Sequence, residues 1–283
     1  MHVETISTGN GRRIERIGSD PRIPGVRRIE WHEAAEPDGT FLRLPLADLV
    51  CTLNLGVVGE YRLPGERRWH AFPRIAARGI SSAPSEGRDP AHGVLGYVSI
   101  VIAPWAFPIY TGLAAAPLAN RVVDLAAASA GWRTMGDQLQ AQDDGRNRVQ
   151  CVATFLSRIA AEAVWPVRTA QVLDAIAADE PVAALARRAG LSTRRVHQLC
   201  VSGTGHNPST YRKIARFGRL MQALHQSGLT TDWSAHVREY ADHSHAIREF
   251  RRLAGMTPRR YAATRATLGR TYSIVPHPDT ANS

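Results

Sequence analysis

A pair of histidines in the last third of the chain has the residue type and spacing of a metal site. His243 and His245 are separated by one residue, and His236 lies a short way before them. Histidine is the commonest metal ligand in proteins. The pair coincides, however, with the start of a helix that Asp242 is able to cap, so helix surface is the favoured role. We therefore expect no bound metal and no cofactor.

Three cysteines could in principle supply a nucleophile. Cys51, Cys151 and Cys200 form no C-x-x-C pair, and their number is odd. These spacings exclude a disulfide framework and a cysteine-rich zinc module, and they suit a reducing cytoplasm. Buried, small apolar side chains are the favoured role. The protein is expected to be cytoplasmic and not an enzyme.

The positive charge of the chain is confined to one segment. The formal net charge is +10, and residues 168–270 carry 17 Arg and Lys against 7 Asp and Glu, whereas residues 1–167 are nearly balanced. Such a bias is the electrostatic footprint of a polyanion partner, most often nucleic acid. A basic surface kept for solubility is the alternative. No run reaches the roughly 18 apolar residues of a membrane span, so no membrane partner is expected.

The amino-terminal part of the chain has the pattern of strands. Apolar runs at 49–55 and 94–102 are rich in β-branched residues and end at turn residues. We expect a mainly antiparallel, barrel-like β domain, with a polar loop at 78–92. No H-x-H with a downstream Glu and His occurs among its strands, which argues against a metal-dependent β-barrel enzyme. His70 and His92 are expected at the surface or in turns.

The pattern becomes helical in the second half, and the fold class is therefore α+β with two domains. Apolar residues between 149 and 160 share one helix face, which could pack on the β domain or pair in a dimer. Pro166 breaks this pattern, and seven helices are expected beyond it. The expected organisation is a β-rich regulatory or sensor domain at 1–120, a helical segment at 121–164, an all-α domain at 165–270 and a disordered tail at 271–283.

The helical domain contains an internal repeat. Gly205-x-x-Pro208-x-x-Tyr211 recurs fifty residues later as G-x-x-P-x-x-Y beginning at Gly255, and Cys200 and Phe250 stand at the same offset before the two copies. Each copy follows a helix, a tight turn and a second helix. The repeat predicts two helix-turn-helix units joined by a long helix. The second helix of such a unit enters a DNA major groove.

These residues resemble the AraC/XylS family of transcription regulators. The resemblance is carried by VAALARRAGLSTRRVHQL, GTGHNPSTYRKIARF and EYADHSHAIREFRRLAGMTPRRY, which occur in order over residues 170–266. A weaker resemblance, through GVLGYVSIVIAPWAFPIYTGLAAAPLANRVVDLAAASAG, links residues 40–165 to the amino-terminal domain of an actinobacterial-type subgroup. It brings no known ligand with it. Activation through RNA polymerase is implied by the family, and repression is equally compatible with the residues.

The resemblance implies a set of DNA-binding residues. The base-reading positions fall on Arg194, His197 and Gln198 in the first unit and on His243, Ser244, His245 and Arg248 in the second. Arg pairs with guanine and Gln with adenine, and Ser is permissive. Arg195, Arg251 and Arg252 are better placed for phosphates, which position the protein. Several of the ten could instead be plain solvated helix surface.

Two positions depart from the family pattern. Cys200 stands where the first recognition helix usually has an aromatic residue, and Glu239 occupies the turn position where the second unit usually has glycine. The second turn must therefore take a strained left-handed residue or be rebuilt. We expect the second unit to contact mainly the DNA backbone rather than the bases.

The expected function is a sequence-specific DNA-binding regulator, most simply an activator. Its first domain senses a small molecule or mediates homodimerisation; Trp69, Trp105, Phe107 and Tyr110 could line an aromatic pocket, although core is favoured. The alternatives are a constitutive regulator without a ligand and, less favoured, an alkyl-transfer repair protein with the same binding module. The latter needs a zinc-held cysteine cluster that the spacings do not provide.

Overall fold

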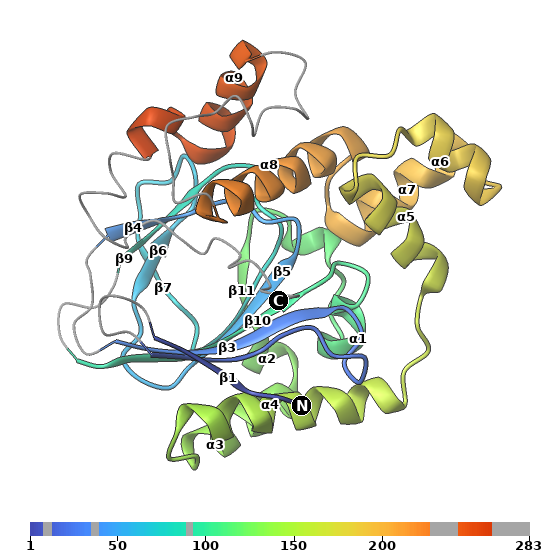
Figure 1. Cartoon of the computed structure of the whole chain (residues 1–283). Helices are drawn as coiled ribbons and strands as arrows, with labels where there is room; N and C mark the ends of the chain where they lie inside the picture. The colour runs from blue at the N-terminus through green and yellow to red at the C-terminus, as the bar shows by residue number, and fades with distance from the viewer. Residues whose placement is uncertain (8–12, 35–39, 89–92, 227–242, 262–283) are drawn as a thin grey trace.

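The computed structural model describes residues 1–7, 13–34, 40–88, 93–226 and 243–261. Two antiparallel sheets form the amino-terminal part (Figure 1). The seven-stranded sheet has the order β1-β2-β3-β10-β5-β8-β11, and the four-stranded sheet has the order β4-β9-β6-β7. The first contains β1 (Glu4–Ser7), β2 (Arg13–Ile17), β3 (Val26–Ala34), β10 (Leu95–Ile102), β5 (Leu49–Asn54), β8 (Ile75–Arg78) and β11 (Val122–Asp124). The second contains β4 (Thr40–Arg43), β9 (Ser85–Arg88), β6 (Glu60–Arg62) and β7 (His70–Ala71).

The strand pattern confirms the expected antiparallel β class, with two differences. Among the described strands no barrel is closed, because the seven-stranded sheet ends at β1 and β11 without a further partner. The segment 78–92, expected to be a loop, contains β9. Its strand pairs with β4 and β6, and Arg62 and Arg88 form ion pairs with Glu86 and Glu60. Cross-strand pairing therefore overrides its polar, turn-rich composition.

Helices cover one face of the seven-stranded sheet. They are α1 (Phe107–Thr111), the 3-10 turn η1 (Ala116–Leu118), α2 (Leu125–Ala128), α3 (Ala130–Gln140) and α4 (Gly145–Ala161). Helix α4 lies against β2 and β3 (Figure 1), and its fully buried residues are Val149, Val152, Ala153 and Leu156. The apolar face expected at 149–160 thus packs on the chain's own sheet. Strand β11, at 122–124, lies between η1 and α2, where only helix was expected.

The carboxyl-terminal part is helical. It contains α5 (Val167–Ala177), α6 (Val182–Ala189), α7 (Thr193–Thr204), α8 (Pro208–Gln226) and α9 (His243–Ala254), followed by a helical turn at 258–261. The fifth of the expected helices, at 232–239, lies outside the described residues, as do His236, Glu239, His92 and the tail. Helix α8 runs between the first unit and α9 (Figure 1). One continuous hydrophobic core joins this part to the β-rich part.

A buried charged cluster ties β2 to β3. The Glu30 carboxylate lies 2.7 Å from Arg16 Nη2, 3.0 Å from Arg28 Nε and 3.4 Å from His32 Nε2. Burial by itself raises the pKa of the Glu30 carboxyl, but the hydrogen bond from His32 and the charges of Arg28 and Arg16 outweigh burial and hold the pKa well below its usual range.

The Glu30 cluster predicts a specific pH dependence of stability. Because the folded-state pKa is depressed, its contribution is present above the ordinary pKa near 4.5 and is lost as the pH falls through the lower folded value. Glu30→Gln should therefore lower the free energy of unfolding by about 1–3 kcal/mol at neutral pH. Urea melts of both proteins from neutral to acid pH check this, and a gap that stays constant down to the lowest pH would contradict it.

Candidate nucleic-acid interface

The first helix-turn-helix unit is built from α6 and α7. Gly190 ends α6 in the left-handed conformation, with φ of 62°, and the Ser192 hydroxyl caps α7 by accepting a hydrogen bond from the Arg195 backbone N–H at 3.2 Å. Helix α7 buries Val196, Cys200 and Thr204 against the domain. Its opposite face carries the four exposed side chains Arg194, Arg195, His197 and Gln198. All four residues named from the sequence in this unit therefore face solvent.

The second unit presents α9 in the same way. Phe250 is fully buried, and Ala246, Leu253 and Ala254 pack beside it. The exposed side chains on this helix are His243, Ser244, Arg248, Arg251 and Arg252. His245 differs, since its side chain is half-buried and its Nε2 lies 3.9 Å from the Glu249 carboxylate on the same helix. Nine of the ten residues named from the sequence are thus exposed, and His245 lies at the edge of the core.

The two copies of the repeat have the same local geometry. Gly205 and Gly255 have φ of 75° and 73°, and Tyr211 and Tyr261 are 2% and 1% exposed. The equivalent cap in each copy comes from Asn207 Oδ1 or Thr257 Oγ1, which accepts from the backbone N–H three residues later at 2.9 or 3.3 Å. Cys200 and Phe250, at the matching offset, are both fully buried. The sequence repeat is therefore a repeat of backbone conformation, capping and burial.

Arginines of α8 connect α9 to the segment between α5 and α6, and sequence reasoning did not single them out. Arg212 Nε and Arg216 Nη1 lie 3.1 and 3.7 Å from the carboxylate of Asp179, a residue after α5 whose φ is +71°. Arg216 Nε also donates to Glu249 Oε1 on α9 at 3.2 Å. The signal that could have found them is their spacing of four residues, which places both on one helix face.

Part of the helical region that carries the repeat matches a known protein family. A helix-turn-helix domain family matches residues 185–264, the range that contains α7, α8 and α9. The chain carries an AraC-type helix-turn-helix domain. This confirms the resemblance stated from the sequence motifs of the carboxyl-terminal part.

Three solved structures are similar to this chain at low sequence identity. ToxT from Vibrio cholerae O395 has 9% identity and a TM-score of 0.45, over 84% of this chain and 97% of that one. The AraC-like transcriptional activator CuxR has 16% identity and a TM-score of 0.33, over 78% and 86%. A predicted oxalate decarboxylase from Thermotoga maritima has 13% identity and a TM-score of 0.26, over 36% and 91%. No curated protein sequence matches the chain. The identification of the AraC-type domain therefore rests on the family match.

The arginines of the AraC-type domain divide into two groups. Arg212, Arg216 and Arg219 on α8 make internal contacts, Arg219 with the carbonyl oxygen of Ala177. The exposed arginines among the described residues from 168 onward are Arg168, Arg187, Arg188, Arg194, Arg195, Arg248, Arg251, Arg252, Arg259 and Arg260. Arg188 is paired with Glu180 at 2.7 Å. Most of the exposed positive charge is therefore available to a polyanion.

The β-rich part contacts both copies of the repeat. His206 Nε2 lies 3.0 Å from the carbonyl oxygen of Ile80, in a buried position next to Gly205. A Cβ atom at Gly255 would lie 3.2 Å from Pro84 Cγ. The segment that contains Ile80 and Pro84 thus touches the turn that follows each recognition helix.

The close packing of Gly205 against residues 116–119 predicts that two glycine substitutions lower the free energy of unfolding by different amounts. A Cβ atom at Gly205 would lie 2.5 Å from Ala119 Cβ and 2.6 Å from the Ala116 carbonyl oxygen, whereas one at Gly190 meets nothing within 4 Å. Both residues have positive φ. Gly190→Ala should cost about 1 kcal/mol in backbone strain, and Gly205→Ala about 2–4 kcal/mol because overpacking is added. Chemical denaturation measures both free energies of unfolding. Equal losses in the two variants would show that Gly205 does not pack against Ala116 and Ala119 in solution.

The structure describes the surroundings of most residues that could have formed a metal site, a cysteine nucleophile or an aromatic pocket. Among the described residues, no group of three or more His, Cys, Asp or Glu could hold a metal ion. Burial raises the pKa of the thiols of Cys51, Cys151 and Cys200, the last to about 11. Phe107 and Tyr110 belong to the core, Trp69 lies beneath the guanidinium groups of Arg62 and Arg88, and Trp105 is partly exposed. No described helix has the length and apolarity needed to span a bilayer.

Proposed function

We propose that this protein is a sequence-specific transcriptional regulator whose helices α7 and α9 enter two successive major-groove segments about one helical turn apart. The observation that carries the proposal is the equivalence of α7 and α9 and of the turns that follow them. Each helix presents a row of exposed Arg, His, Gln or Ser side chains and precedes a matching Gly-x-x-Pro turn. The surrounding exposed arginines supply the attraction to phosphates.

Within this proposal the ten residues have different roles. Arg194, His197 and Gln198 read bases in the first segment, and the equivalent row of α9, His243, Ser244, His245 and Arg248, reads the second. Arg195, Arg251 and Arg252 bind phosphates, because Arg251 and Arg252 stand in the last turn of α9, away from its amino-terminal end. His245 contributes least to base reading, since half of its side chain is withdrawn toward Glu249.

Base reading and phosphate binding predict different mutant behaviour. Arg194→Ala should cost about 1–3 kcal/mol on the cognate site and relax specificity at one or two base positions, with little effect on random DNA. Arg252→Ala should weaken binding to cognate and random DNA alike. Fluorescence anisotropy with both DNAs at matched salt measures the two effects. Equal losses on both DNAs for both variants would show that the roles are assigned wrongly.

The β-rich domain at 1–120 and the helical segment at 121–164 are proposed to regulate the DNA-binding domain at 165–270. A small-molecule effector or homodimerisation would act through the contacts at Ile80 and Pro84, and an activator would in addition contact RNA polymerase. The alternative is a constitutive regulator whose first domain only supports the second. The buried thiols, with raised pKa values, count against alkyl-transfer chemistry.

The experiment that tests the proposed function is selection of fragments bound by the full-length protein from its source genome, followed by footprinting. The expected result is a protected site with two segments spaced by about one helical turn. Recovery of fragments without a shared sequence would contradict sequence-specific regulation.

A further inference from the structure

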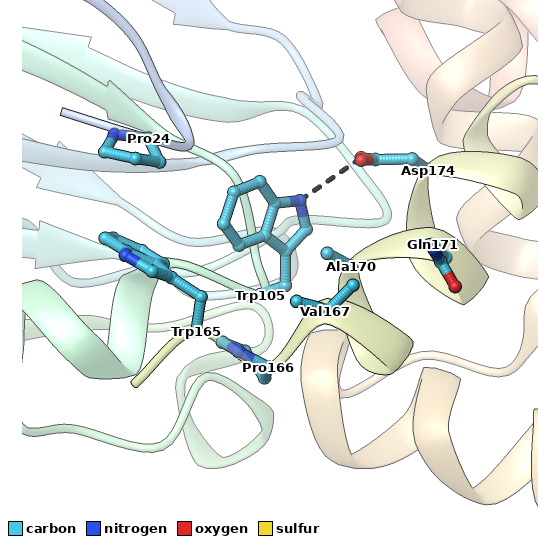
Figure 2. Close-up of a pocket in the computed structure, with 8 residues that line it drawn as sticks. All are labelled: Pro24, Trp105, Trp165, Pro166, Val167, Ala170, Gln171 and Asp174. Atoms are coloured by element: carbon cyan, nitrogen blue, oxygen red, sulfur yellow. Dashed lines mark hydrogen bonds between the residues drawn. The ribbon is translucent and has the colours of Figure 1, made fainter. Parts of the chain in front are cut away.

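A pocket lies where the two parts of the chain meet, on the side of α5. Its volume is about 230 Å³. Pro24 and Trp105 come from the β-rich part, Trp165 and Pro166 from the connection before α5, and Val167 and Asp174 from α5 itself (Figure 2). The pocket is therefore built by the β-rich part, the connection and the DNA-binding domain together.

Two indole rings dominate the lining. Trp105 and Trp165 have ring centroids 5.9 Å apart and an angle of 82° between their planes, so they form a corner rather than a slot. Tyr110 supports Trp165 at a centroid distance of 5.8 Å. A flat aromatic ligand can stack on one such ring but cannot be sandwiched between the two. A compact, rounded group can contact both rings at once.

The polar group of the corner is a carboxylate. Asp174 projects toward Trp105, whose Nε1–H donates to Asp174 Oδ1 at 3.3 Å (Figure 2). Half of the Asp174 side chain remains exposed. A carboxylate acceptor at Nε1 pushes electron density into the indole, and an electron-rich ring attracts cations more strongly.

The charge of Asp174 is only partly compensated. Arg27 lies 3.4 Å from Asp174 and 3.5 Å from Asp48, so one guanidinium is shared by two carboxylates. Both distances exceed the roughly 2.7–2.9 Å of a strong charge-assisted hydrogen bond. No Arg, Lys or His is among the residues that line the pocket. The local field therefore favours a cation.

We propose that this corner binds a quaternary ammonium group, held by the two indole faces and the Asp174 carboxylate. Aromatic surfaces with a nearby carboxylate recognise such cations because a methylated ammonium is bulky, weakly hydrated and unable to donate hydrogen bonds. The pocket is dominated by apolar groups and offers it few polar partners. An effect of this ligand on DNA affinity rests on the proposed regulatory function, whereas its binding to the pocket does not.

The test is isothermal titration calorimetry of the full-length protein with choline and with tetramethylammonium. The neutral isostere 3,3-dimethyl-1-butanol serves as the matched probe, because it has the shape of choline without the charge. We expect saturable binding of both cations and binding of the isostere weaker by about 3- to 30-fold. Trp165→Leu and Asp174→Asn should each weaken cation binding by a similar factor, and Trp69→Leu, which removes an indole outside the pocket, should leave it unchanged.

Three results would overturn the proposal: no saturable binding of either cation, equal affinity for the isostere, or unchanged affinity in both pocket variants. Asp174→Asn preserves the shape of the side chain and changes a half-exposed position, so folding of that variant is checked by circular dichroism without ambiguity. DNA binding is measured separately by anisotropy with and without choline. Ammonium binding in a protein that fails to bind specific DNA would contradict the proposed function and leave the pocket assignment standing.

Discussion

Raising the salt concentration from about 50 to about 200 mM is expected to weaken DNA binding by roughly 500-fold, if about five phosphates are neutralised. The reason is the release of counterions from DNA when arginines replace them. Arg195, Arg251 and Arg252 are the proposed phosphate contacts, and other exposed arginines of the domain add to them. Anisotropy titrations of the full-length protein across this salt range measure the slope of log K against log salt.

Two arginine variants test which part of the chain produces this salt dependence. Arg251→Ala should reduce its magnitude by about one contact, whereas Arg67→Ala, an exposed arginine in the nearly neutral amino-terminal part, should leave it unchanged. A slope near zero in the wild-type protein, or equal changes in the two variants, would contradict phosphate binding by the helical domain.

Loss of the Arg216 side chain is expected to cost about 3–5 kcal/mol in free energy of unfolding, because it leaves the buried Glu249 carboxylate without its arginine partner. The Arg216 and Glu249 side chains are 12% and 5% exposed, and their closest atoms are 3.2 Å apart. Arg216 also lies 3.7 Å from Asp179, so its removal weakens the connection of α8 and α9 to the segment between α5 and α6. Urea denaturation of Arg216→Ala measures the loss.

A double substitution separates the ion pair from simple packing. Arg216→Met combined with Glu249→Met removes both charges and should recover much of the stability lost in Arg216→Ala. Arg248→Ala, on the exposed face of the same helix, should change the free energy of unfolding by no more than about 0.5 kcal/mol. A loss as small as that of Arg248→Ala would show that the pair does not hold α9 in place.

The helical half was the more predictable part, since its signals are local. Gly190 and Ser192 mark the end of one helix and the start of the next, and the structure has a left-handed residue and a side-chain cap at these two positions. Burial of every fourth or third apolar residue in α7 likewise determines which face is exposed. The exposure of Arg194 and Gln198 follows from that periodicity. His245 was harder to place, because it lies at the boundary between the faces.

The β-rich half depends on pairings between distant segments, and its sequence pattern was correspondingly less informative. Ser85–Arg88 has the composition of a loop, and only its pairing with β4 and β6 makes it a strand. The same holds for β11, which pairs with β8 across more than forty residues. Strand propensity describes a half-buried pleated surface, so a segment without neighbours has little preference of its own.

The sequence by itself determined the first helix-turn-helix unit, the repeat of α7 and its following turn in α9, the caps of both copies and the exposed basic faces, because helix periodicity, caps and positive-φ glycines act within a few residues. Tertiary structure alone decided which charged groups are used internally and where the two parts of the chain meet. Arg212 and Arg216 are chemically the same as Arg194, yet Asp179 and Glu249 hold them between helices. The corner of Trp105 and Trp165 likewise exists only because residues 60 positions apart are packed together, and no local pattern encodes such a contact.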